Sequence, residues 1–203
     1  MRSTGEVLGL AENFPLAFHK SQVGSGTACG VKTVQWTVFS ESPSSYVAKA
    51  AGSELPHAPA AWENKKVLIS LSNKEGQKDQ VLEIGKTLKN LGFTLVGTQG
   101  TADFYNANGI KCDFVNRIGG GRPDVIDIIL NKEVCLVINT PKAKRNYAED
   151  RKTIRKACLK YKVSYITTIA GALAAVKGIE SVKNGNGGEG GVKSLQEYHS
   201  LIK

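Results

Sequence analysis

The sequence has few of the residues on which metal centres and nucleophilic sites usually depend. Its 203 residues include three histidines and four cysteines, and no two cysteines have the CxxC spacing of zinc and redox motifs. Cys112 and Cys135 fall within apolar runs, so we expect buried free thiols rather than disulfides or zinc ligands. The histidines have no second ligand at metal spacing, and we therefore predict no metal site.

Long apolar runs are also missing. A membrane helix needs roughly 20 consecutive apolar residues, and no stretch of the chain approaches this length. The first ten residues, MRSTGEVLGL, lack the apolar core of a secretory signal. Hydrophobic residues make up 41% and charged residues 22% of the chain, which is typical of soluble globular proteins. We expect a cytoplasmic protein without a membrane partner.

Acidic residues are in the minority, because 27 Lys and Arg outnumber 18 Asp and Glu and give a formal net charge of +9. The excess is concentrated in residues 142–162, which contain nine basic residues and only two acidic ones, Glu149 and Asp150. A basic stretch suggests a nucleic acid or a phosphorylated ligand, but a solvated helix face explains it as well. No aromatic stacking platform accompanies the charge, so we predict no nucleic-acid partner.

Short apolar runs alternate with helix-like segments over most of the chain. The runs that predict strands are 66–71, 93–98, 111–115, 133–139 and 163–168, and the segments that predict helices are 78–91, 101–107, 148–161 and 170–180. Pro123 fits the first turn of one more helix, which carries Val125 and Ile129. This alternation predicts an α/β fold with a five-stranded parallel sheet in a Rossmann-like three-layer α/β/α arrangement.

The composition divides the chain into four parts. Residues 1–23 end in an amphipathic helix with Phe14, Ala17 and Phe18 on one side, and residues 24–63 read as a linker or insertion without periodicity. Residues 64–183 form the predicted α/β domain. Residues 184–203 begin with the flexible linker NGNGGEGG and end in a short docking segment.

Polar residues gather where the predicted strands end, and ligands of parallel sheets bind at this edge. Hydroxyls, amides, cations and helix N-termini suit the oxygens and the charge of a phosphate. The predicted anion site contains Ser70, Lys78, Thr98, Gly100, Thr101, Arg117, Asn139 and Thr140. Each of these residues taken alone also has a purely structural explanation, because a threonine can cap a helix and a lysine can be solvated. Their convergence on one edge favours an anion pocket.

None of the residues of the predicted anion site is an evident catalytic group. The strand ends carry no histidine, cysteine or unpaired carboxylate, so neither general acid–base nor nucleophilic chemistry is supported. The glycines of GTQGTA (97–102) match neither G-x-G-x-x-G nor the P-loop. The residues therefore predict binding without reaction.

Several segments together resemble a known family. The segments ISLSNKEGQKD, LGFTLVGTQGTADFYNANGI, GRPDVIDIILN, LVINTP and IRKACLKYKVSYITT are similar to the methylglyoxal-synthase-like domain over about 64–181, and specifically to the C-terminal allosteric domain of carbamoyl-phosphate synthase large subunits. MRSTGEVLGLAENFPLAFHKSQ resembles the end of the second ATP-grasp unit of that family, and SLQEYHSLIK resembles its C-terminus.

The resemblance implies a regulatory domain that binds UMP or IMP. It places Ser70, Lys78, Thr98, Thr101, Arg117, Asn139 and Thr140 on the phosphate side. It also places Tyr165 and Thr167 in the ornithine site of some members. The fragment itself would hold no cofactor, whereas the parent ligase uses ATP with Mg or Mn to make carbamoyl phosphate for pyrimidine and arginine biosynthesis. Its partners would be the ATP-grasp domains and the glutaminase small subunit.

The sequence departs from the family at a few positions that bear on the ligand. Arg117 stands where lysine is usual, and Pro141 removes a hydroxyl donor that some members have. The enzymatic alternative is a methylglyoxal-synthase-like lyase acting on dihydroxyacetone phosphate, but GGGRPD has Arg122 near the place of its carboxylate base. Met1 falls inside a motif that is internal in the family, so we expect a fragment of a longer protein.

Overall fold

The protein was analysed as a computed structural model, which describes residues 7–25, 29, 65–72, 76–140, 148–183 and 195–200. One parallel sheet of five strands lies at the centre of this part of the chain, with the strand order β3-β2-β1-β4-β5. The strands are β1 (Lys66–Ser70), β2 (Thr94–Gly97), β3 (Cys112–Phe114), β4 (Val134–Asn139) and β5 (Ser164–Ile166). The five strands and their parallel direction confirm the prediction from the sequence, although each is shorter than its apolar run.

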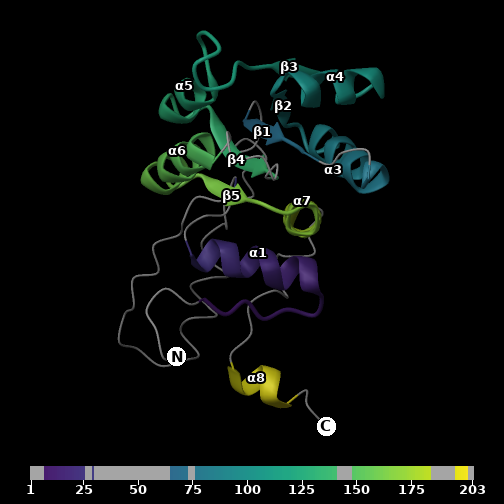
Figure 1. Cartoon of the computed structure of the whole chain (residues 1–203). Coiled ribbons are helices and arrows are strands. Elements are labelled where there is room, and N and C mark those ends of the chain that lie inside the picture. Colours follow the sequence, from purple (N-terminus) through teal and green to yellow (C-terminus); the bar gives the residue numbers. More distant parts are fainter. Residues whose placement is uncertain are drawn as a thin grey trace.

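Helices cover both faces of the sheet. They are α1 (Phe14–Gly24), α3 (Lys78–Asn90), α4 (Gln99–Ala107), α5 (Val125–Leu130), α6 (Ala148–Lys160), α7 (Ile169–Lys183) and α8 (Leu195–Ser200). One core cluster joins α3, α4 and α7 to the sheet, and a second joins α5 and α6 to the opposite face. Figure 1 shows the two groups on either side of the strands. This arrangement is the predicted three-layer α/β/α fold.

The N-terminal helix α1 packs on the outside of α7, beyond the sheet (Figure 1). The approach is close at Gly178, where a Cβ atom would lie 2.6 Å from the carbonyl oxygen of Pro15. The helix buries Leu16 and His19 against this surface. The prediction that Phe14 belongs to the buried side of α1 is wrong, because Phe14 is 68% exposed. The residues of α1 that lie against Gly178 of α7 are Pro15 and His19.

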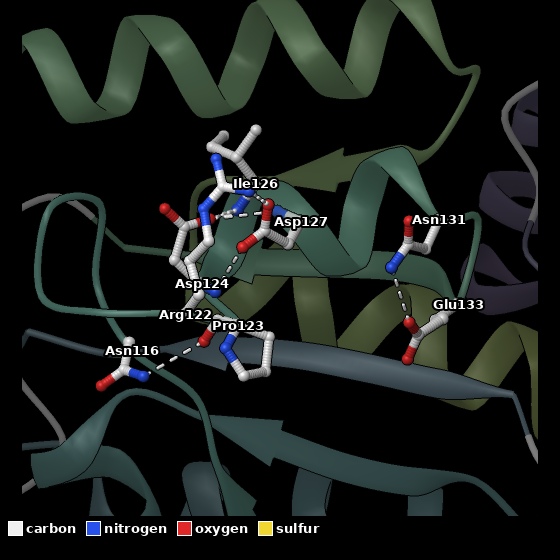
Figure 2. Close-up of polar contacts among 8 residues, drawn as sticks. All are labelled: Asn116, Arg122, Pro123, Asp124, Ile126, Asp127, Asn131 and Glu133. Carbon is white, nitrogen blue, oxygen red and sulfur yellow. Dashed lines mark hydrogen bonds and ion pairs between the residues drawn. The ribbon is translucent and has the colours of Figure 1, made fainter.

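The start of α5 differs from the prediction at Pro123. Asp124 is the N-cap, and its Oδ1 accepts hydrogen bonds from the backbone N–H groups of Ile126 and Asp127. In return, Asp127 Oδ2 accepts from the N–H of Asp124 at 3.0 Å, which completes a capping box (Figure 2). Pro123 therefore lies before the cap and not in the first turn of the helix.

The cysteines also differ in part from the expectation of buried free thiols. Cys29 is joined to Cys135 by a disulfide across 106 positions of sequence. Cys112 and Cys158 are free and buried. The prediction of buried free thiols is thus correct for Cys112 and wrong for Cys135, because a partner so distant in sequence leaves no local signal.

Candidate anion-binding cavity

A cavity opens at the carboxyl ends of β1, β2 and β4, the three central strands. The pairing register aligns Ser70 with Asn139, and Ile69 with Gly97, so the residues that leave these strands meet at one place. Five of the eight residues predicted for the anion site line this cavity: Ser70, Thr98, Arg117, Asn139 and Thr140. The cavity lies at the point where the connections leave the sheet in opposite directions, as expected for open α/β folds.

Hydroxyl groups form the floor of the cavity. Ser70 Oγ lies 3.3 Å from Thr98 Oγ1. Thr140 Oγ1 accepts a hydrogen bond from the N–H of Ser72 at 2.9 Å and lies 3.3 Å from Ser72 Oγ. A hydroxyl has one donor and two acceptor positions, so these side chains can hold the loop after β1 and still face a ligand oxygen.

Asn139 connects the cavity to β5. Its side chain is 8% exposed, and its Nδ2 donates a hydrogen bond to Tyr165 Oη at 3.3 Å. Burial raises the pKa of Tyr165 above its ordinary value, and the hydrogen bond from Asn139 opposes this shift. Tyr165 is therefore a neutral phenol at physiological pH, and it positions the amide of Asn139.

Thr101 lies beneath the cavity and does not line it. Its side chain is 1% exposed, and Oγ1 accepts a hydrogen bond from the backbone N–H of Leu71 at 3.1 Å. Gly100 belongs to the first turn of α4, and Lys78 is the exposed first residue of α3. The structure thus gives the Thr101 hydroxyl a supporting contact with the chain that leaves β1.

A second cavity adjoins the first at the start of α7. Its lining includes Thr167, predicted from the family resemblance, together with Gln77 and Thr168, and it has a volume of about 280 Å³. Ser72 and Thr140 line both cavities. The two spaces therefore share one hydroxyl wall.

The sequence reasoning missed two charged residues of the first cavity. Asp150 and Arg151, both from the first turns of α6, line it together with Ile154. The sequence places both in the basic stretch 142–162, for which a phosphorylated ligand and a solvated helix face were alternatives, and the three-residue spacing from Arg151 to Ile154 indicates that this side of α6 faces inward. Asp150 brings a carboxylate to the cavity from α6, a helix that the prediction, made for the strand ends, did not include.

Two further properties concern the described part of the chain. No three His, Cys, Asp or Glu side chains within it come together in the way that a metal ion would need. None of its helices combines the length and the apolar character required to span a bilayer.

The fold and the cavity define a Rossmann-like α/β domain with a polar cleft at the carboxyl edge of its sheet. Residues 80–167 match the family model of the MGS-like domain. This segment, which is less than half of the chain, is therefore similar to MGS-like domains.

Curated relatives extend the similarity to nearly the whole chain. The carbamoyl phosphate synthase large chain of Archaeoglobus fulgidus is 38% identical over 199 residues, which is 98% of this chain and 15% of the relative. The C-terminal section of the carbamoyl phosphate synthase large chain is 36% identical over 183 residues in Methanopyrus kandleri (90% of this chain, 28% of the relative) and 34% over 203 residues in Aquifex aeolicus (99% and 31%). The chain thus corresponds to a C-terminal part of such large chains and spans less than a third of each of these relatives, which confirms the resemblance inferred from the sequence.

Proposed function

We propose that this chain is a regulatory domain that binds a nucleoside monophosphate in the first cavity and regulates a carbamoyl phosphate synthase. The observation that carries the proposal is the meeting of Ser70, Thr98 and Thr140 hydroxyls from three neighbouring strands. Neutral donors at a strand edge, with cations near them, suit a phosphate and are poor at proton transfer. The relatives named above are the reason to connect this site with carbamoyl phosphate synthesis.

The size of the cavity fits one phosphate group better than a whole nucleotide. Its volume is about 70 Å³, whereas pockets that enclose a drug-sized ligand measure roughly 300–1,000 Å³. The phosphate would lie on the hydroxyl floor with Arg117 and Arg151 near it. The nucleoside would then extend toward the open side, along the wall that α6 contributes.

The second cavity is the proposed site of a second effector of the ornithine type. Tyr165 and Thr167 lie on β5 and just after it, and Thr167 lines this cavity. Because Ser72 and Thr140 line both cavities, a ligand bound in one cavity would change the affinity of the other cavity for its ligand. Any such coupling is reciprocal, so each ligand must change the affinity of the other by the same factor.

In a complete synthase, the bound effector would bias the conformation of the neighbouring ATP-grasp domain, and the glutaminase small subunit would belong to the same complex. The chemistry with ATP and a divalent cation would take place in those other domains. A binding role without catalysis for this domain agrees with its cavity, which is rich in hydroxyl groups and has Asp150 as the only carboxylate of the described lining.

Calorimetric titration of the full chain with UMP, IMP and ornithine tests the proposal. We expect heat with at least one nucleotide, and we expect Thr98→Val to weaken that binding by about 10- to 100-fold, since hydrogen bonds to charged groups contribute about 1.5–3 kcal/mol. Thr153→Val is the matched control, because Thr153 is an exposed threonine of α6 whose hydroxyl donates to the backbone carbonyl of Glu149. No binding of any of the three compounds would overturn the proposal.

The lyase alternative has one supporting feature, the carboxylate of Asp150 in the cavity. Incubation with dihydroxyacetone phosphate distinguishes the two functions. We expect no release of methylglyoxal above the rate of a heat-inactivated sample. Release that disappears in Asp150→Asn would replace the regulatory proposal with the enzymatic one.

A further inference from the structure

Two cysteines that are distant in sequence meet inside the main core. Cys29 and Cys135 are 106 positions apart, and their Cα atoms lie 5.2 Å from each other, within the roughly 4.4–6.8 Å that a disulfide bridges. Cys29 is 4% exposed and belongs to the core cluster of α3, α4 and α7. Cys135 is partly buried and packs against the same cluster.

A bulge in β4 explains why Cys135 faces this core. The register pairs Lys66 with Val134 but Val67 with Leu136, so Cys135 is an extra residue between two ladder positions. Val134 faces the opposite core, whereas Cys135 and Leu136 both face the side of α7. A regular strand would send consecutive side chains to opposite faces, so the bulge is what places the Cys135 sulfur opposite Cys29.

The bond joins a residue shortly after α1 to a strand of the central sheet. Cys29 follows the last residue of α1, Gly24, by five positions, and α1 packs on α7 outside the sheet. We propose that Cys29 and Cys135 are a reversible redox pair, whose disulfide fastens the end of α1 to the central sheet. The pair is distinct from both cavities, and the inference does not depend on the proposed function.

The chemistry is thiol–disulfide exchange with a small disulfide such as oxidised glutathione as the oxidant. The more accessible Cys135 attacks it as a thiolate, forms a mixed disulfide and releases one reduced glutathione. The Cys29 thiolate then attacks the Cys135 sulfur and releases the second. The two protein thiols lose two protons and two electrons, and the oxidant leaves as two reduced thiols.

The other two cysteines provide an internal contrast. Cys112 and Cys158 are free, and burial raises the pKa of each thiol to about 12. Thiolates are the reactive form, so both react slowly at neutral pH. Cys29 and Cys135 differ from them in having a cysteine partner at bonding distance, so we expect a mild oxidant to form this one disulfide.

Thiol counting on the full chain tests the bond. The chain is equilibrated with oxidised or reduced glutathione, quenched in acid, denatured and alkylated. In the oxidised sample we expect alkylation of two of the four cysteines and a cross-linked peptide that contains Cys29 and Cys135. Cys135→Ser should abolish this peptide, whereas Cys158→Ala should retain it. Alkylation of all four cysteines across the whole redox series, or a different pairing, would overturn the proposal.

Hydrogen exchange tests the consequence for α1 and needs no substitution. Reduction of the wild-type chain should accelerate amide exchange in residues 14–24 by about tenfold or more, because the bond no longer restricts separation of this segment. The α5 amides are the internal control and should be unchanged, because α5 packs in the opposite core. Equal exchange of α1 in both redox states would show that the bond does not hold the helix and would overturn the fastening role.

Discussion

Removal of the Thr101 hydroxyl is the sharpest test of how the cavity is built. In Thr101→Val the side chain keeps its shape but loses the acceptor of the Leu71 N–H bond, which is 3.1 Å long. Thr101 is 1% and Leu71 is 6% exposed, so water has no easy access to the orphaned N–H. An unsatisfied buried donor costs about 1–3 kcal/mol, and we expect the free energy of unfolding to fall by that amount.

The assay is urea unfolding of the full chain, followed by circular dichroism, with the slope of the transition compared between variants. Thr98→Val is the informative partner, because Thr98 faces the cavity and its contact with Ser70 is 3.3 Å long. Water in the cavity can replace that contact, so we expect less than about 1 kcal/mol of destabilisation. An unfolding free energy for Thr101→Val within about 0.5 kcal/mol of wild type, at unchanged slope, would refute the supporting role of Thr101.

Three further predictions concern α5 and the α1–α7 contact. Asp124→Ala removes the capping box of α5 and should destabilise the chain by about 0.5–2 kcal/mol in urea unfolding, whereas Asp124→Asn should retain much of the cap. Gly178→Ala would put a Cβ 2.6 Å from the Pro15 carbonyl oxygen and 2.8 Å from His19 Cβ; we expect faster hydrogen exchange in α1, and unchanged exchange would argue against the close packing. Burial holds the pKa of His19 below its ordinary value of 6.5, so the unfolded chain binds the proton first and stability should fall as the pH drops through about 6.5. His19→Leu should lose this part of the pH dependence, and identical profiles for both proteins would contradict it.

The sheet was predictable because its central strands are buried on both faces. Val67, Leu68 and Ile69 are each at most 1% exposed, and such a strand can only be a continuous apolar run. The spatial order β3-β2-β1-β4-β5 was not predicted, because an apolar run indicates a buried strand but not the strands with which it pairs. The order nevertheless decides which strand ends meet and hence the composition of the cavity.

The site was predicted in part, and the misses have physical causes. The helix α4 begins at Gln99, two residues earlier than its sequence pattern suggested, and this start directs Thr101 inward while Thr98 remains at the cavity. The spacing of Asp150 and Arg151 from Ile154 indicates the inward side of α6, but the packing of α6 on the sheet decides that this side reaches the cavity. The bond between Cys29 and Cys135 depends on one extra residue in β4, and a bulge has no reliable sequence signal.

The shared wall of the two cavities has a consequence for regulation. Thr140 Oγ1 holds the Ser72 N–H, and both residues line both cavities. A ligand oxygen that binds Thr140 from one side changes the hydrogen-bonding options of the same hydroxyl on the other side, since it has a single proton to donate. Asn139 adds a connection to β5, because this residue lines the first cavity and its amide donates to Tyr165, two residues before Thr167 of the second cavity. Two ligands at this edge would therefore compete for, or jointly orient, the same few donors. Coupling between them requires no movement of the sheet, because the shared groups are side chains at the strand ends.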